Sequence, residues 1–251
     1  MGKVYLIGAG PGAADLITLR GARLLQQADA VLYDALVQPE LLALVNPSAR
    51  LIAAGKRCNK LSTNQMFINK MLVDAARHNK LVVRLKGGDP MIFGRAQEEL
   101  AALQAAGIEY EVVPGITSAV AAAAELGVSL TQRGLSRNVV FITPRVGDKE
   151  AVSDWVQSVL AADTAVLYMA FGLSAEISAA LMQRGMPGDT PAAIIGNVSL
   201  PNMKKTFTSL AQLPDAAKDV GMPALIVLGE VLRDQLQNNW LASIEQSAAV
   251  A

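Results

Sequence analysis

Short runs of apolar, often β-branched residues alternate with longer amphipathic segments along the first half of the chain. The short runs predict strands at residues 3–8, 30–34, 50–55, 80–86 and 110–115. The longer segments predict helices at residues 17–28, 40–45, 64–78 and 95–107. Strands that are hydrophobic nearly throughout and are separated by helices are typical of a parallel sheet covered on both faces. This half is therefore predicted to be a doubly wound α/β domain.

A second series of elements follows the Pro114-Gly115 pair. Apolar runs lie at residues 138–143, 164–169, 190–195 and 223–231, with amphipathic segments at residues 150–161 and 174–185. These runs are less regular than those of the first half, so we expect a mixed sheet. The pattern predicts a two-domain α/β protein, with an N-terminal domain of residues 1–113 and a C-terminal domain of residues 114–251.

Composition narrows the classes of function. The chain has 251 residues, and its 22 Lys and Arg residues equal its 22 Asp and Glu residues. No global basic field is therefore available to bind nucleic acid or an anionic membrane. The single cysteine, Cys58, excludes an internal disulfide, and the apolar run after Met1 is too short for a signal peptide or a membrane span. We expect a cytoplasmic protein.

The single histidine, His78, lies at a predicted helix end, where a solvated role is the ordinary one. Ser-His-Asp hydrolysis and histidine-metal chemistry are accordingly disfavoured, and no metal site is expected.

Unusual residues gather at the predicted strand ends. They include GAGPG after the first strand, Asp34 after the second, GGDP after residue 86, PGITS after residue 113, and Met169. Ligands of open α/β sheets bind at the carboxyl ends of strands. The sequence therefore predicts one ligand cleft at which these ends converge.

The segment GAGPGA, residues 8–13, matches the permissive dinucleotide fingerprint, and Asp34 stands where an acid would bind ribose. An NAD-dependent oxidoreductase is one interpretation. Pro11 argues against it, because proline lacks a backbone N–H group at a place where a bound pyrophosphate would need one. A site for another ligand and a plain strand-to-helix turn are the alternatives.

Two further features indicate a binding site. Glycines in KGGDP allow close approach of a ligand, and Asp89 can accept a hydrogen bond from a hydroxyl pair, although a simple turn is also possible. Arg95 and Glu98 share one helix face, and Arg133 follows in LTQRG. Each is individually more typical of a solvated surface, but at strand ends the arginines suit carboxylate binding.

Six motifs together are specific enough to indicate a family. They are VYLIGAGPG, DAVLYDALV, AAGKR, VVRLKGGDPMIFGR, EVVPGITSA and AVLYM. In combination they resemble the S-adenosylmethionine-dependent tetrapyrrole methyltransferases, and most of all the uroporphyrinogen-III C-methyltransferases. The resemblance extends over residues 3–232 and is strongest before residue 134.

The resemblance implies a homodimer with S-adenosylmethionine in a cleft between the two domains of each subunit. It implies transfer of two methyl groups, to C2 and C7 of uroporphyrinogen III, to give precorrin-2 for the sirohaem and cobalamin routes. Methylation of a later precorrin is the alternative within the family. An NAD-dependent oxidoreductase and a non-catalytic binding module are the alternatives outside it.

Site residues carry over from the resemblance position by position. It implies substrate contacts from Arg95, Glu98 and Arg133, with Asp34 as proton acceptor and Lys56 as proton donor. A structural ion pair, or two charges at the rim of the cleft, are the alternatives for Asp34 and Lys56. The implied cofactor contacts are Pro11, Gly87, Gly88, Asp89, Ile92, Thr117, Ser118, Met169, Val198 and Ala224.

The chain departs from the family pattern in three places. Asn59 and Leu61 replace an expected glycine and histidine, and residues 143–145 read Thr-Pro-Arg instead of Thr-Gly-His. Residues 196–199 read GNVS, with Val198 where a glycine is common. We expect Val198 to narrow the cofactor pocket and Arg145 to add a carboxylate contact.

Overall fold

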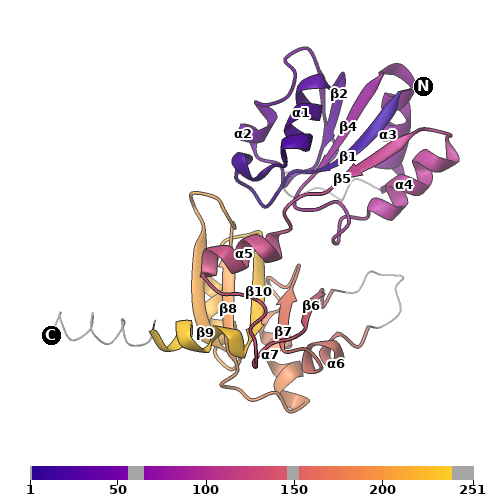
Figure 1. Ribbon diagram of the computed structural model, residues 1–251. Coiled ribbons are helices and arrows are strands. Elements are labelled where there is room, and N and C mark those ends of the chain that lie inside the picture. Colours follow the sequence, from indigo (N-terminus) through magenta and orange to yellow (C-terminus); the bar gives the residue numbers. More distant parts are fainter. Residues whose placement is uncertain (1, 56–64, 146–152, 239–251) are drawn as a thin grey trace. The chain divides into compact units, whose positions relative to one another are not determined.

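The computed structural model describes residues 2–55, 65–145 and 153–238 (Figure 1). The chain divides into two compact units, Met1–Ser118 and Ala119–Ala251. Each unit contains its own five-stranded sheet with helices packed on it. The α/β fold class predicted from the alternating pattern is confirmed.

The first unit is built on a parallel sheet with the strand order β3-β2-β4-β1-β5. Its strands are β1 (Lys3–Gly8), β2 (Ala30–Tyr33), β3 (Arg50–Ala53), β4 (Leu81–Lys86) and β5 (Tyr110–Val113). Its helices are α1 (Leu19–Gln27), α2 (Pro39–Leu42), α3 (Gln65–His78) and α4 (Ala96–Ala105), with a 3-10 turn at Ala14–Leu16.

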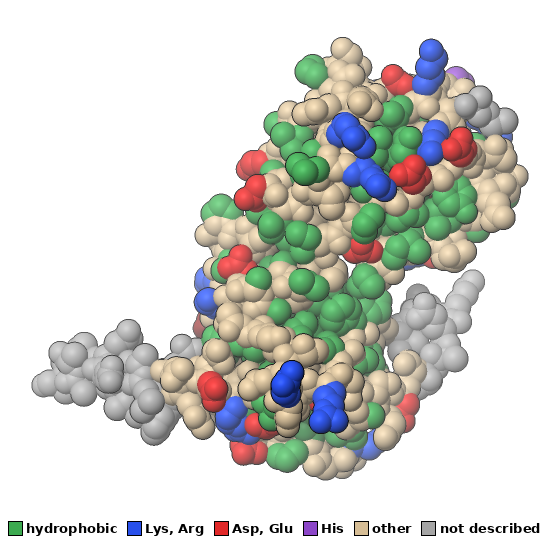
Figure 2. Space-filling view, in the orientation of Figure 1, with side chains coloured by type: hydrophobic (Ala, Val, Ile, Leu, Met, Phe, Trp, Pro, Cys, Tyr) green, Lys and Arg blue, Asp and Glu red, His purple; other side chains and the backbone are tan. Residues whose placement is uncertain are grey.

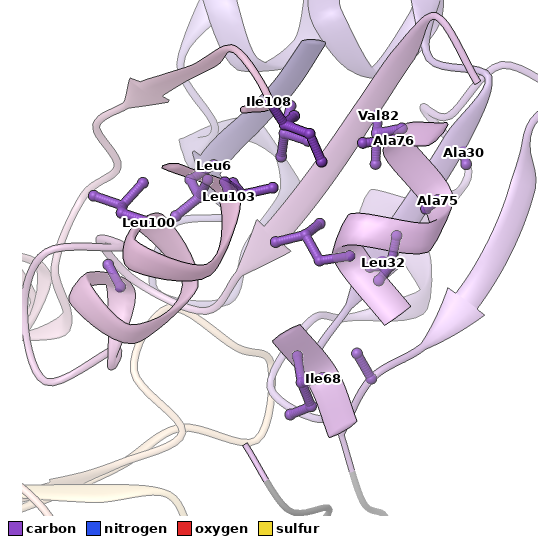
Figure 3. Close-up of a cluster of buried hydrophobic side chains, with 14 residues drawn as sticks. Leu6, Ala30, Leu32, Ile68, Ala75, Ala76, Val82, Leu100, Leu103 and Ile108 are labelled. Atoms are coloured by element: carbon purple, nitrogen blue, oxygen red, sulfur yellow. The ribbon is translucent and has the colours of Figure 1, made fainter. Parts of the chain in front are cut away.

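Alternate residues of the strands supply two separate cores, one on each face of this sheet. Leu6, Leu32 and Val82 point toward α3 and α4 and pack with their apolar side chains (Figure 3). Their sequence neighbours, such as Ile7 and Val83, belong to the opposite core with α1 and α2. Because successive strand residues point to opposite faces, strands buried on both sides must be apolar almost throughout. This explains the hydrophobic runs seen in the sequence.

The second unit has the strand order β6-β7-β10-β8-β9, and its sheet is mixed, as predicted. Strands β6 and β7 are parallel, whereas β10 runs antiparallel to both β7 and β8, and β9 runs antiparallel to β8. The strands are β6 (Val139–Ile142), β7 (Thr164–Leu167), β8 (Pro191–Gly196), β9 (Lys204–Ser209) and β10 (Ala224–Gly229).

Helices of this unit are α5 (Ser118–Leu126), α6 (Trp155–Leu160), α7 (Ser174–Gln183) and α8 (Leu213–Ala216), with 3-10 turns at Ala217–Asp219 and Glu230–Leu232. Leu167, Ile194 and Ile226 of the sheet pack with Ile177 and Leu181 of α7 in one core. The Asp154 carboxylate caps α6 by accepting a hydrogen bond from the Gln157 amide. Among the described residues, no helix is both long and apolar enough to cross a membrane.

Basic and acidic side chains are interspersed on the face shown in Figure 2. This distribution agrees with the equal numbers of cationic and anionic residues in the sequence. Binding of an anionic ligand must therefore depend on individual side chains at a particular place.

Candidate functional site

The carboxyl ends of all strands of the first unit meet at one edge of its sheet, because these strands are parallel. Residues 9–11 follow β1, Asp34 follows β2, residues 87–90 follow β4, and residues 114–118 follow β5. Seven of the fifteen site residues expected from the sequence lie on these four segments. The structure therefore brings Pro11, Asp34, Gly87, Gly88, Asp89, Thr117 and Ser118 to the same edge of one sheet.

Backbone contacts between glycines hold three of these segments together. Gly10 and Gly88 exchange two hydrogen bonds, with N···O distances of 3.2 and 2.7 Å. A Cβ atom on Gly115 would lie 2.4 Å from the Gly88 carbonyl oxygen and 2.7 Å from the Gly8 Cα. Only glycine permits such close approach of backbones. The glycines therefore have a packing role as well as the binding role inferred from the sequence.

Gly88 differs from its neighbours because the space beside it is open. Its φ of +67° lies in the left-handed region, and a Cβ atom there would meet only the Thr117 Cα, at 4.0 Å. Glycine at this position keeps the backbone accessible on that side. A ligand approaching Gly88 would meet main chain directly, which is the property expected of a glycine that serves a binding site.

The Asp89 carboxylate links its own loop, which follows β4, to the segment that follows β5. One oxygen accepts a hydrogen bond from the Met91 amide at 2.8 Å, and the other accepts from the Gly115 amide at 2.9 Å. Each carboxylate oxygen can accept more than one hydrogen bond. Asp89 therefore organises the loops, and its geometry also allows it to accept from a ligand hydroxyl.

Asp34 has a similar position at the end of β2. Its carboxylate is half-buried and accepts hydrogen bonds from the Leu36 amide at 2.9 Å and from the Gly87 amide at 3.0 Å. The second contact connects Asp34 directly to the GGDP segment. Lys56, its expected proton-donor counterpart, lies outside the described residues, as do Asn59 and Leu61.

Arg95 and Glu98 form a bidentate ion pair at the beginning of α4. The Arg95 Nε and Nη2 atoms donate to the two carboxylate oxygens at 2.7 and 2.8 Å, and the side chains are 59% and 49% exposed. Arg95 has a left-handed backbone with φ of 55°, which is uncommon for a residue with a side chain. Ile92 is half-buried on the same loop.

A buried charged cluster was missed by the sequence analysis. Arg84 and Lys86 of β4 both donate to the Glu99 carboxylate of α4, and their side chains are only 4% and 6% exposed, while Glu99 is fully buried. Two charged residues at alternate positions of an otherwise apolar strand were the available signal. That spacing places both side chains on one face of the sheet.

The second unit presents a comparable edge. Since β8 runs in the same direction as β6 and β7, residues 143–145, Met169 and residues 197–199 follow three strand ends at one edge, where β10 begins with Ala224. Met169, Asn197 and Ser199 have left-handed backbones, with φ of 53°, 52° and 65°. Such conformations cost energy and are frequent in functional loops.

The sequence singled out Val198, Arg145 and Arg133 in the second unit, and the structure places the first two at this edge and the third elsewhere. Val198 is buried, and the Arg145 Nε donates to the Met169 carbonyl at 3.0 Å, so this arginine holds the turn that bears Met169. Arg133 is exposed on a turn whose Ser136 hydroxyl contacts the Thr164 hydroxyl at 2.9 Å. That contact anchors the Arg133 turn at the amino end of β7, the opposite end of the strand from Met169.

The geometry also bears on the dinucleotide interpretation of GAGPGA. Helix α1 begins only at Leu19, with the Thr18 side chain accepting from the Gly21 amide. In a dinucleotide fingerprint the glycine-rich turn opens the helix directly, so that the helix N-terminus faces the pyrophosphate. Here a 3-10 turn and further residues separate the two. The GAGPG segment contacts GGDP instead.

These features define a two-unit α/β protein with glycine-lined strand ends. The chain belongs to the tetrapyrrole methylase family, since the family model described as Tetrapyrrole (Corrin/Porphyrin) Methylases matches residues 3–214. The resemblance inferred from the motifs is thereby confirmed. Among solved structures, uroporphyrin III C-methyl transferase from Thermus thermophilus is 37% identical, with a TM-score of 0.81, and the match covers 92% of this chain and 99% of that one.

Other relatives agree with this assignment. The Thermus enzyme has also been solved in complex with S-adenyl homocysteine. A cobalt precorrin-4 methyltransferase is 32% identical, with a TM-score of 0.80, over 92% of this chain and 95% of that one. Siroheme synthase of Zymomonas mobilis is 46% identical over 96% of this chain. The chain spans about half of that protein, 51% of its length.

Proposed function

We propose that this protein is a uroporphyrinogen-III C-methyltransferase, which transfers two methyl groups from S-adenosylmethionine to C2 and C7 of uroporphyrinogen III and yields precorrin-2. The main support is the match to the Thermus uroporphyrin III C-methyl transferase, which covers 99% of that enzyme. Because the chain spans only half of the siroheme synthases, we assign to it only the methyl transfer. Methylation of a later precorrin is the second candidate, since a precorrin-4 enzyme is also similar.

The residues at the two sheet edges suit the methyl donor. In the first unit we assign cofactor contacts to Pro11, Gly87, Gly88, Asp89, Ile92, Thr117 and Ser118, and in the second unit to Met169, Val198 and Ala224. The open space beside Gly88 supports this assignment, because a side chain there would occupy the approach to the backbone. When bound, S-adenosylmethionine supplies a methyl group already activated by its sulfonium. The protein's main task is then orientation of the reactants.

We assign substrate binding to Arg95 and Glu98. The sequence predicted that Arg133 would join them, but its turn is anchored at the amino end of β7, opposite the edge that bears Met169, so we leave it out of the proposed site. Uroporphyrinogen carries eight carboxylates, and a guanidinium binds a carboxylate with two parallel hydrogen bonds. A guanidinium has five N–H donors, and Glu98 engages only the Nε and one Nη of Arg95. The remaining donors are available to a substrate carboxylate, and Glu98 holds the guanidinium in a fixed orientation.

We assign the proton transfers to Asp34 and Lys56. Attack by a pyrrole carbon on the methyl group leaves an iminium-like ring that must lose a proton. The two backbone amides that bind Asp34 fix its carboxylate at the end of β2, next to the GGDP segment. A carboxylate in that place can accept the proton, provided that the macrocycle lies against the same edge.

The direct test uses uroporphyrinogen III and S-adenosylmethionine under reducing, anaerobic conditions. We expect a product with two added methyl groups, each in place of a proton, detected by mass spectrometry as a gain of two CH2 units, together with S-adenosylhomocysteine. Turnover of a later precorrin without turnover of uroporphyrinogen III would favour the second candidate. Binding of S-adenosylhomocysteine without methylation of any tetrapyrrole would indicate a binding module.

The Arg95 assignment predicts a specific kinetic defect. We expect Arg95→Ala to raise the KM for uroporphyrinogen III roughly three- to tenfold, a modest change because the site is exposed. The affinity for S-adenosylhomocysteine, measured by calorimetry, should stay unchanged. Arg50→Ala is a matched control, since Arg50 is exposed at the amino end of β3, the opposite edge of the sheet. A loss of cofactor affinity with unchanged KM would refute the assignment.

The family resemblance further supports a homodimer in the cytoplasm. Sedimentation velocity at micromolar concentration is expected to show a species of twice the monomer mass. A monomer that is fully active would exclude a role for the dimer.

A further inference from the structure

The buried cluster next to the GGDP loop contains two basic side chains, Arg84 and Lys86, but only one carboxylate, that of Glu99. Arg84 Nε donates to Glu99 at 2.9 Å, and Lys86 Nζ donates to both oxygens of Glu99 at 3.1 Å. Gln65 of α3 completes the cluster with a 3.4 Å contact to Glu99. Two cations thus share one carboxylate within the layer between the sheet and α3 and α4.

Such an arrangement is costly as a purely structural device. Burying a charged side chain costs on the order of several kcal/mol per ion. Apolar residues of similar size often stabilise a core at least as much as a buried ion pair does. Burial, and after it the neighbouring Arg84 guanidinium, lowers the pKa of the Lys86 ammonium, while Glu99 and Asp34 act in the opposite direction. Glu99 therefore has two buried basic partners, although one cation would suffice to neutralise its carboxylate.

Lys86 differs from Arg84 in what its own backbone and stem contact. It is the last residue of β4, and its carbonyl accepts from the Ala9 amide at 2.7 Å. The next amide, that of Gly87, donates to the Asp34 carboxylate. A Cβ atom on Gly94 would lie 3.2 Å from the Lys86 Cε, so the far end of the loop packs onto the lysine stem.

Glu99, the partner of Lys86, is the residue next to Glu98, which binds Arg95. Glu99 points inward from the first turn of α4, and its neighbour Glu98 points outward to Arg95. The loop of residues 87–95 is thus held at its beginning by the Lys86 backbone, near its end by the contact with Gly94, and at α4 by Glu99. The left-handed backbones of Phe93 and Arg95 need such external support.

We propose that Lys86 is a positioning residue, whose buried ammonium, bound to Glu99, sets the conformation of the loop of residues 87–95 and so orients Gly88, Asp89 and Arg95. Lys86 acts through these residues and does not itself touch the reactants. This role depends on the proposed function in one respect, because it takes the loop to carry contacts to the methyl donor.

Lys86→Met tests this role, because methionine keeps an unbranched stem beneath Gly94 and removes only the charge and its hydrogen bonds. We expect the Kd for S-adenosylhomocysteine to rise about tenfold, and amide hydrogen exchange of residues 87–95 to become faster in the ligand-free protein. Lys80→Met, an exposed lysine beside the amino end of β4, should match the wild type in both measurements.

A second control separates positioning from general destabilisation. Ile108→Val removes one methyl group from the same core and lowers stability without touching the loop. Equal effects of Ile108→Val and Lys86→Met on loop exchange and affinity would overturn the proposal, as would wild-type values for Lys86→Met. If Lys86→Met does not fold, Lys86→Gln, which keeps a polar side chain and removes the charge, replaces it, and wild-type affinity and exchange would then overturn the proposal.

The same measurements distinguish failure of this inference from failure of the proposed function. A wild-type protein that binds no S-adenosylhomocysteine contradicts the proposed function. Hydrogen exchange in the ligand-free variants still decides whether Lys86 orders the loop.

Discussion

Glu99→Ala is expected to lower the free energy of unfolding by about 3–5 kcal/mol, because it leaves the buried cations of Arg84 and Lys86 without their carboxylate. Both side chains are nearly inaccessible to water, and among the described residues Glu99 is the anion with which they form direct ion pairs. Chemical denaturation followed by far-UV circular dichroism measures the change. The loss should be concentrated in the first unit, which contains all three side chains.

Glu98→Ala is the matched control for this experiment. Glu98 is the preceding residue of the same helix, and its carboxylate is half exposed and binds the exposed Arg95. The helix propensity change is the same for both substitutions, so the difference between them reports burial and ion pairing. Exposed pairs contribute at most about 1 kcal/mol. Equal destabilisation by the two substitutions would show that the buried cluster does not contribute to stability.

Gly115→Ala is expected to reduce affinity for S-adenosylhomocysteine more than tenfold and to lower stability by about 1–3 kcal/mol. A methyl group there would lie 2.4 Å from the Gly88 carbonyl oxygen and 2.7 Å from the Gly8 Cα, and both of these are backbone atoms. The segment that follows β5 must therefore move away from GGDP and from the end of β1. That movement also disturbs the bond from the Gly115 amide to Asp89. Isothermal calorimetry and chemical denaturation measure the two effects separately.

Gly107→Ala provides the comparison for Gly115→Ala. Gly107 has a left-handed backbone with φ of +67°, and a Cβ atom there would meet no other atom within 4 Å. Its substitution costs about 1–2 kcal/mol of backbone strain and leaves the strand ends in place. We expect unchanged affinity for S-adenosylhomocysteine. Wild-type affinity in Gly115→Ala would mean that the glycine contacts do not shape the cofactor site.

Elements with a clear period were predicted well from the sequence. The apolar runs of the first half became β1, β2, β3, β4 and β5, and the helix expected at residues 64–78 is α3, Gln65–His78. Boundaries were less accurate where turns compete with the period. The helix expected at residues 40–45 is the single turn Pro39–Leu42.

The candidate site was predicted in part. Strand-end motifs located Gly88, Asp89 and Asp34 at one edge, because the direction of parallel strands follows from the pattern alone. The same motifs did not reveal that Asp89 and Asp34 bind backbone amides of other loops. They also left GAGPGA open to a dinucleotide interpretation. Only the position of α1, which begins at Leu19, removed that ambiguity.

By itself, the sequence determined the alternation of strands and helices, the two-sheet α/β class and the family motifs, because these depend on local periodicity and on residues adjacent along the chain. The tertiary structure alone decided that Glu99 joins Lys86 and Arg84, and that Gly115 meets Gly8 and Gly88. Those contacts join segments far apart in the sequence. Their energies come from burial and close approach, which exist only after the sheet and its helices have packed together.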